Sequence, residues 1–432
     1  MNMKVNELML YRNMEQNHIL HDFAFLMENY NNEYYNKEDL RGLLFDCVNE
    51  ILELSVTHGL EGNLWHDYLT FVLASDENAY STSCEIVGQI DGSINTIALH
   101  DFEIFKGLFD YDFTELEKVL DVNCISMLLD YQSSDEHGSV FNKRIRDRIC
   151  TLSKDLAQAE NAEIFKEVLT QFYKEFGVGK FGLHKAFRVE HTEHGAQIVP
   201  ITKIAHVHLD DLVGYEIAKK KLIDNTEAFV NGKKANNCLL YGDAGTGKST
   251  SIKAILNQYY DQGLRMIEIY KHQFQDLNDI IAQIKNRNYK FIIYMDDLSF
   301  EEFEIEYKYL KAVIEGGLER KPENVLIYAT SNRRHLVRET FKDKADRDEE
   351  LHTNDTVQEK LSLVARFGVT IYFGKPDKKQ FQEIVRQLAA RSELNITEQE
   401  LLMEANKWEL QHGGMSGRTA QQFVDYLVGT RN

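Results

Sequence analysis

The feature that most constrains the fold is a glycine-rich loop at residues 242–250, which reads Gly-Asp-Ala-Gly-Thr-Gly-Lys-Ser-Thr. This order matches G-x-x-x-x-G-K-S/T, the pattern of a phosphate-binding P-loop. A short apolar run at 238–241 precedes the loop, and apolar residues at helical spacing follow it. A glycine-rich turn that matched by chance would lack this strand and this helix. The sequence therefore predicts a nucleoside triphosphate site between a buried strand and a helix.

Each part of the loop has an expected role. Glycine lets the backbone wrap closely around a phosphate chain, and amide groups at the helix N-terminus attract the phosphates. We expect Lys248 to reach the β- and γ-phosphates and the Ser249 hydroxyl to bind Mg²⁺. The loop residues predicted to bind the nucleotide are Gly242, Asp243, Ala244, Gly245, Thr246, Gly247, Lys248, Ser249 and Thr250.

A pair of carboxylates follows a second apolar run, residues 291–295. The carboxyl end of a central strand is where a P-loop ATPase holds its magnesium-binding acid. We predict that Asp296 holds Mg²⁺, directly or through water, and that Asp297 polarises the attacking water. Glu301 or Glu302 is a reserve candidate for that base. A strand-end turn capped by two aspartates is the alternative, and the P-loop earlier in the chain argues against it.

The central part of the chain, residues 206–375, is predicted to form an α/β P-loop module. Strand-like runs alternate with helical stretches there, which is typical of a parallel sheet flanked by helices. The fourth run leads into Asn332, and a polar residue at this strand tip would lie beside the γ-phosphate. The runs predicted to form a parallel five-stranded sheet are 238–241, 264–269, 290–295, 324–330 and 369–373.

The regions on either side of the module are predicted to be helical. Residues 1–205 have no proline before Pro200 and carry apolar stripes at helical spacing. One short strand at 94–99 and a β-hairpin between 187 and 201 are expected to interrupt this N-terminal domain. Residues 376–432 predict a small lid of three helices, with helix-capping signals before the first two.

The charge of the chain is unevenly distributed. Residues 1–210 hold 35 acidic and 17 basic side chains, whereas residues 211–432 hold 34 acidic and 32 basic ones. An acidic region repels a phosphate backbone, so we do not expect the N-terminal domain to carry nucleic acid. This domain presents either a face that docks a protein partner or a solvated surface that aids solubility.

Cysteine content and hydropathy limit the cellular compartments in which the protein is expected. Five cysteines without a C-x-x-C pair predict a reduced, cytoplasmic protein. No apolar run approaches the ~20 residues of a membrane span. The N-terminus lacks a signal-peptide pattern, so we expect no membrane partner.

Taken in order, these motifs resemble those of the AAA+ ATPase superfamily across residues 211–428. The glycine-rich loop resembles Walker A. The pair Asp296-Asp297 resembles Walker B, with aspartate where glutamate is usual in the second position. The resemblance also implies an adenine-side segment at Leu212, Val213, Gly214 and Tyr215, sensor 1 at Asn332, an arginine finger at Arg366 and sensor 2 at Arg418.

The resemblance implies ATP and Mg²⁺ as cofactors, an ATPase activity and a homo-oligomer that forms a hexameric ring or open ring. In such an assembly Arg366 would reach the nucleotide of a neighbouring subunit, and closure of the lid would bring Arg418 onto the nucleotide. The catalytic residues are then Lys248, Asp297, Asn332, Arg366 and Arg418, and the metal ligands are Ser249 and Asp296.

A fuller pattern, Asp-Asp-Leu-Ser-Phe-Glu at 296–301, resembles an uncharacterised bacterial AAA+ family with a domain of unknown function. That closer resemblance adds no substrate. Residues 270–275 lack the pore loop of polypeptide-threading members, and Phe274 is expected to be a core aromatic rather than its substitute.

Two functions stay open at this point. The first is an ATP-driven remodelling enzyme that acts on a protein partner through the acidic N-terminal domain. The alternative is a nucleic-acid-associated loader or initiator-type switch, suggested by Asp297 and by the basic residues Arg333, Arg334 and Arg338. A small-molecule P-loop kinase is a third class, and the lid and the sensor-like arginines argue against it.

Overall fold

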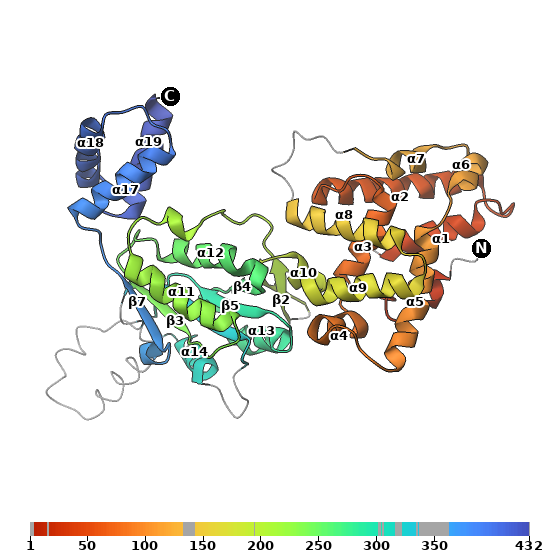
Figure 1. The fold of residues 1–432 in the computed structure, drawn as a ribbon, viewed down its shortest axis with the longest axis horizontal. Helices are drawn as coiled ribbons and strands as arrows, with labels where there is room; N and C mark the ends of the chain where they lie inside the picture. The colour runs from red at the N-terminus through yellow and green to blue at the C-terminus, as the bar shows by residue number, and fades with distance from the viewer. Residues whose placement is uncertain are drawn as a thin grey trace. The chain divides into compact units, whose positions relative to one another are not determined.

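The computed structural model describes residues 4–14, 17–132, 143–193, 195–300, 304, 306–315, 322–333, 336 and 363–431. The chain forms two compact units, which meet in the sequence between His184 and Lys185 (Figure 1). We expected the sheet-bearing part to begin near residue 206, and the unit that contains the sheet begins at Lys185.

The first unit is built from helices in the ranges that the structure describes. The short strand expected at 94–99 is wrong, because these residues lie in helix α5. Ala98, Phe102 and Phe105 fall on one face of that helix and are fully buried, which fits a helical repeat. The elements are η1 (Val5–Glu7), α1 (Asn17–Asn29), α2 (Lys37–His58), α3 (Leu64–Ser75), α4 (Ala79–Val87), α5 (Ser93–Phe109), α6 (Thr114–Leu120), α7 (Cys124–Leu129), α8 (Lys143–Gln158), α9 (Ala162–Phe176) and α10 (Gly179–Leu183).

The second unit contains one seven-stranded sheet in the order β2-β1-β4-β5-β6-β3-β7. The five predicted strands are confirmed, and each pairs in parallel with its neighbour. The sheet has two strands more than the five predicted, because both strands of the predicted hairpin join it. Strand β1 pairs in parallel with β4 and antiparallel with β2. The strands are β1 (Ala186–Thr192), β2 (Gly195–Pro200), β3 (Cys238–Gly242), β4 (Leu264–Glu268), β5 (Lys290–Met295), β6 (Val325–Ser331) and β7 (Val369–Phe373).

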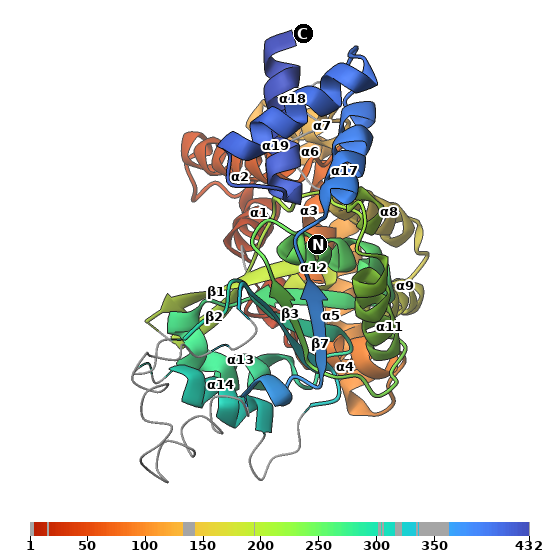
Figure 2. The ribbon, with the colours of Figure 1, turned by 90° about the vertical axis from the view of Figure 1, so that its left-hand side faces the viewer.

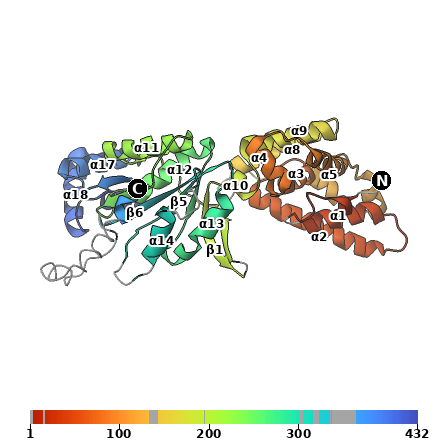
Figure 3. The same ribbon diagram turned by 90° about the horizontal axis from the view of Figure 1, so that it is seen from below.

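Helices cover both faces of this sheet (Figure 3). Helices α11 and α12 lie on one face, and α13 and α14 lie on the other. Strand β3 is therefore buried on both sides, and its apolar run is the uninterrupted kind that such strands need. The elements between the strands are η3 (Leu209–Asp211), α11 (Glu216–Val230), α12 (Lys248–Tyr259), η4 (Tyr260–Gln262), η5 (Lys271–Asp276), α13 (Leu277–Ile284) and α14 (Glu306–Glu315).

Three helices follow the sheet: α17 (Lys378–Arg391), α18 (Glu398–Gln411) and α19 (Gly417–Arg431). The three helices predicted for this region are thus confirmed within residues 376–431, and Figure 2 shows them together. The Asp377 side chain accepts the backbone N–H of Gln380 at 2.8 Å and begins α17. The helices bury a small core of their own, which includes Phe381, Val385 and Phe423.

Strand order explains how distant residues reach one site. Strand β3 lies between β6 and β7, and β6 separates it from β5. Parallel strands end at the same edge, so the P-loop, Asn332 and the pair Asp296-Asp297 meet there. Asn332 follows β6 directly and therefore lies between the P-loop strand β3 and the aspartate strand β5.

The start of the P-loop is fixed against the end of β7. Gly242 has φ 137°, and a Cβ atom on it would lie 2.0 Å from the carbonyl oxygen of Phe373. The next residue, Asp243, donates its backbone N–H to that same oxygen at 3.0 Å. Its carboxylate accepts the N–H of Lys375 at 3.0 Å. Glycine is therefore required at 242 both for its conformation and for this close approach.

This contact predicts a difference between two glycine substitutions. Gly232 also has positive φ, at 71°, but a Cβ atom there would meet nothing within 4 Å. We expect Gly232→Ala to cost about 1 kcal/mol of stability through backbone strain alone. Gly242→Ala should cost about 3 kcal/mol or more, because the backbone must move. Thermal unfolding with and without ADP measures both effects, and equal losses in the two variants would contradict this account.

Candidate nucleotide site

A cavity of about 660 Å³ lies at the carboxyl edge of the sheet, between the P-loop and the lid. Gly214, Gly242, Asp243 and Arg366 are predicted site residues that do not line it. The predicted residues that do line it are Leu212, Val213, Tyr215, Ala244, Gly245, Thr246, Gly247, Lys248, Ser249, Thr250, Asp296, Asp297, Asn332 and Arg418.

Two further glycines let other segments approach the loop. A Cβ atom on Gly247 would lie 2.6 Å from Cδ2 of Leu212, which belongs to the segment before α11. One on Gly245 would lie 3.0 Å from Cβ of Arg418 and from Oγ of Ser416. The loop thus touches the adenine-side segment on one side and the lid on the other.

Lys248 is held over the loop by three acceptors. Its Nζ donates to the carbonyl oxygens of Gly242 at 3.0 Å and Asp243 at 2.6 Å, and to Oδ1 of Asn332 at 3.0 Å. Burial lowers the pKa of Lys248, while the carboxylates of Asp297, Asp243 and Asp296 oppose that shift. A cation in this position is the group that a P-loop uses for the β- and γ-phosphates.

Asp296 and Ser249 form a paired oxygen donor set. Oδ1 of Asp296 accepts the Ser249 hydroxyl at 2.7 Å and the Thr330 hydroxyl at 2.5 Å. Nearby protein displaces part of the water around Asp296, which raises its pKa. The hydroxyl groups of Thr330, Ser249 and Tyr294 outweigh this effect and hold the pKa below its ordinary value. A hydroxyl beside an ionised carboxylate is a donor set that fits Mg²⁺.

Asp297 is held in an uncommon backbone conformation. It has φ 49°, which is left-handed and unfavourable for a residue other than glycine. Its backbone N–H donates to Oγ1 of Thr330 at 2.9 Å. The Asn332 amide donates to Oδ1 of Asp297 at 2.7 Å. Because the same amide accepts from Lys248, Asn332 joins the P-loop lysine to the second aspartate.

Sequence reasoning missed Thr330. Its side chain is almost fully buried, and its one hydroxyl donates to Asp296 and accepts from the N–H of Asp297. The available signal was a polar residue at the end of an otherwise apolar strand, directly beside β5.

Part of the cavity lining is apolar. It includes Leu212 together with Ile384 and Leu388 of α17, neither of which was predicted as a site residue. Tyr215 has φ 61°, and its hydroxyl donates to the carbonyl of Gly374 at 3.1 Å. Burial raises the pKa of Tyr215 to about 12, so the phenol stays neutral and can donate. An aromatic base could lie in this region.

The lid contacts the P-loop directly. The backbone N–H of Arg418 donates to the carbonyl oxygen of Gly245 at 3.1 Å. Gln421 and Gln422 of α19 also line the cavity, and no sequence motif pointed to them. The first turn of α19 is therefore part of the site.

Other predicted residues lie elsewhere. Arg366 forms an ion pair with Glu315 at the end of α14 and is outside the cavity. Phe274 is buried, which confirms it as a core aromatic. Glu301, Glu302, Arg334 and Arg338 lie outside the described residues.

The Thr330 contacts generate a prediction with a defined sign. Thr330→Val removes the strongest hydrogen bond that lowers the pKa of Asp296, so that pKa should rise, whereas Thr330→Ser keeps the hydroxyl and should preserve it. The lowered pKa of Asp296 stabilises the fold at pH values above the pKa of the unfolded state, and this stabilisation is lost as the pH falls through the pKa of the folded state. In Thr330→Val this contribution to stability should be smaller, so less stability should be lost on acidification. Carboxyl ¹³C titration by NMR measures the shift; an unchanged pKa in the valine variant would refute the role of Thr330.

A family model described as "Protein of unknown function (DUF815)" matches residues 182–431. The large subunit of replication factor C from Staphylothermus marinus is 35% identical over 81 residues, which are 18% of this chain and 18% of that protein. The corresponding subunit from Methanococcus maripaludis is 37% identical over 76 residues, 18% of this chain and 15% of that protein. The matched stretch therefore spans less than a fifth of these curated relatives.

Solved structures are similar over half of the chain. The RuvB Holliday junction branch migration motor of Thermotoga maritima has TM-score 0.36 and 18% identity, over 52% of this chain and 66% of that one. The AAA domain of FIGL-1 in complex with ADP has TM-score 0.35 and 15% identity, over 52% of this chain and 74% of that one. Within the described ranges, no helix is long and apolar enough to cross a membrane.

Proposed function

The chain belongs to the DUF815 family, and from this premise we propose that it is an AAA+ ATPase that binds ATP and hydrolyses it with Mg²⁺. The observation that carries the proposal is one connected set of hydrogen bonds at the cavity edge. It runs from Lys248 through Asn332 to Asp297, and from Thr330 through Asp296 to Ser249. The backbone N–H of Asp297 joins the two halves at Thr330.

Each residue in this set has a task in the attack of water on the γ-phosphate. Loop amides and Lys248 would bind the phosphates, and Asp297 would orient and polarise the attacking water. Asn332 would hold that carboxylate in place. Ser249 and Asp296 would hold Mg²⁺, which when bound supplies positive charge against the phosphate oxygens. Arg418, on the first turn of α19, would add a further charge from the lid.

Asp297 should be separable from nucleotide binding. In Asp297→Asn the amide keeps the shape of the side chain but polarises water poorly, so turnover should fall about a hundredfold or more. ATP affinity, measured by calorimetry, should change little. Asp279→Asn, an exposed substitution on α13, is the control. Full turnover in Asp297→Asn would show that another residue polarises the attacking water.

Arg366 is proposed to act on a neighbouring subunit, in a hexameric ring or open ring. Two observations support this role: Arg366 does not line the cavity of its own chain, and it forms an ion pair with Glu315 instead. A trans-acting arginine is worth a factor of about 10³ or more in turnover in P-loop enzymes.

A mixing experiment tests the trans role. Lys248→Ala and Arg366→Ala should each be nearly inactive alone. Mixed in equal amounts, about a quarter of the sites would combine an intact Lys248 with an intact Arg366 from a neighbour, so activity should return. Phosphate release after co-assembly measures this. A mixture as inactive as its components would place Arg366 outside the site.

The proposed substrate is a protein partner, docked through the first unit. Residues 1–184 hold 32 acidic and 14 basic side chains, a balance of -18, which disfavours a nucleic-acid backbone. The second candidate is a nucleic-acid-associated loader or switch. The stretch similar to replication factor C and the exposed Arg333 beside the site favour it. Salt-dependent binding of duplex DNA would select this second candidate.

A further inference from the structure

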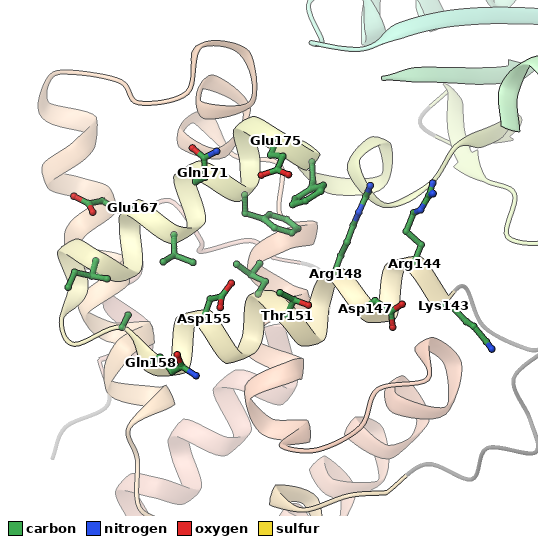
Figure 4. A pocket seen from close by; sticks show the side chains of 16 residues that line it. Lys143, Arg144, Asp147, Arg148, Thr151, Asp155, Gln158, Glu167, Gln171 and Glu175 are labelled. Atoms are coloured by element: carbon green, nitrogen blue, oxygen red, sulfur yellow. The ribbon is translucent and has the colours of Figure 1, made fainter. Parts of the chain in front are cut away.

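A groove of about 990 Å³ runs between helices α8 and α9 of the first unit, and it lies wholly within that unit (Figure 4). Its floor is apolar. Leu152 and Phe172 are buried there, while Val168 and Phe176 are half-buried and face the groove. At one end Ile164 keeps 37% of its surface exposed.

Part of this floor is the edge of the core itself. Leu152 and Phe172 belong to the same core as the fully buried Ile149 of α8 and Phe165 of α9, and Val168 and Phe176 pack against that core. A surface helix normally presents polar residues away from its core face. Helix α9 instead extends its apolar surface beyond the core through Ile164, Val168 and Phe176, which line the groove without being fully buried. Apolar surface of this kind marks a place that another group covers.

One end of the groove is basic. Lys143, Arg144 and Arg148 line it, at the start of α8. The first turn of α8 has no acidic residue, although a helix N-terminus favours negative charge. Asp147 is ion-paired with Arg146 at 2.7 Å, and its charge is largely compensated. The Arg148 guanidinium lies 4.5 Å from the centroid of the Phe176 ring, so basic and apolar surface are continuous.

The other end of the groove is acidic. Asp155 and Glu167 line it, and among the residues that the structure describes no basic side chain lines that half. Near the basic end, Asp147 and Glu175 are acidic lining residues beside Lys143, Arg144 and Arg148. Since Asp147 is ion-paired with Arg146, Glu175 is the acid that opposes the basic charge there. Figure 4 shows Arg144 and Arg148 toward one end and Glu167 at the opposite end. The groove therefore combines an apolar floor with opposite charges at its two ends.

We propose that this groove binds an amphipathic helix of a partner protein. The helix would place an apolar stripe on the floor, acidic side chains at Lys143 and Arg144, and basic side chains at Asp155 and Glu167. Two neighbouring helices form a trough into which a third helix packs, and helix-in-groove recognition uses this geometry. A groove along α8 accommodates about 16 residues of helix, or about 24 Å.

Shape and charge disfavour the other occupants. A second copy of the chain would bring a groove against a groove and leave the floor unfilled. Nucleic acid would meet the acidic end and the negative balance of the unit. Binding of a helix in this groove rests on the proposed function in one respect only: the bound partner would be the protein on which the ATPase acts. The binding test uses no nucleotide, so its failure and a failure of the ATPase are distinguishable.

The test uses three fluorescent synthetic helical peptides of about 16 residues and the full chain. The bipolar peptide carries an apolar stripe with a glutamate end and a lysine end. The basic peptide has the same stripe with lysines at both ends, and the scrambled peptide has the bipolar composition without a stripe. Fluorescence anisotropy at about 0.15 M salt keeps long-range attraction small.

Wild-type chain should bind the bipolar peptide about tenfold more tightly than the other two. General attraction to an acidic unit would instead favour the basic peptide. The double variant Lys143→Glu with Arg144→Glu makes both ends acidic, so the preference should reverse toward the basic peptide. Lys154→Glu, on the same helix but outside the groove, should leave the preference unchanged. Ile164→Gln should weaken all stripe-dependent binding without loss of fold, because the side chain is partly exposed.

Several results would overturn the proposal. One is that the bipolar peptide does not bind at about 100 μM. Another is that the double variant and Lys154→Glu show the same ratio of affinities for the bipolar and basic peptides. Displacement of the peptide by duplex DNA would assign the groove to nucleic acid. A change in sedimentation of the chain itself in the double variant, with no effect on peptide binding, would assign it to self-association.

Discussion

The site depends on one amide group. Asn332 accepts a hydrogen bond from Lys248 and donates one to Asp297, so a single side chain links the ends of β3, β5 and β6. An amide has both an acceptor and a donor, and only such a group can satisfy a cation and a carboxylate at once. Aspartate at 332 would face Asp297 with like charge, and leucine would leave both neighbours unsatisfied. The strand order makes this contact available, because β6 lies between the other two strands.

A second constraint is the glycine content of the loop. Gly242 approaches the backbone of β7, Gly247 approaches Leu212 and Gly245 approaches Arg418. Each contact attaches the loop to a different part of the unit. A change in the loop on binding phosphate would therefore reach both the adenine-side segment and the lid. The hydrogen bond from the Arg418 N–H to the Gly245 carbonyl is a direct path to the lid.

Many of the residues that line the cavity of this unit were predicted from the sequence, because a P-loop depends on local order. A glycine pattern, a strand and a carboxylate pair are all visible within short windows. Thr330, Gln421 and Ile384 were missed because their roles arise only when separate segments meet. The strand at 94–99 was wrong because residues of strand-like composition lie on a helix whose neighbours supply a buried face. In the first unit the sequence showed helices but no site, since the α8–α9 groove is a product of packing.

The central claim is that the site is a composite ATPase, complete only between subunits. The most direct measurement is phosphate release per subunit against protein concentration, with sedimentation in ATP at each concentration. The account predicts a rate per subunit that rises with assembly and reaches a plateau when assembly is complete. A constant rate from a monomer across the whole range would contradict it, and would require a site that needs no arginine from a neighbour.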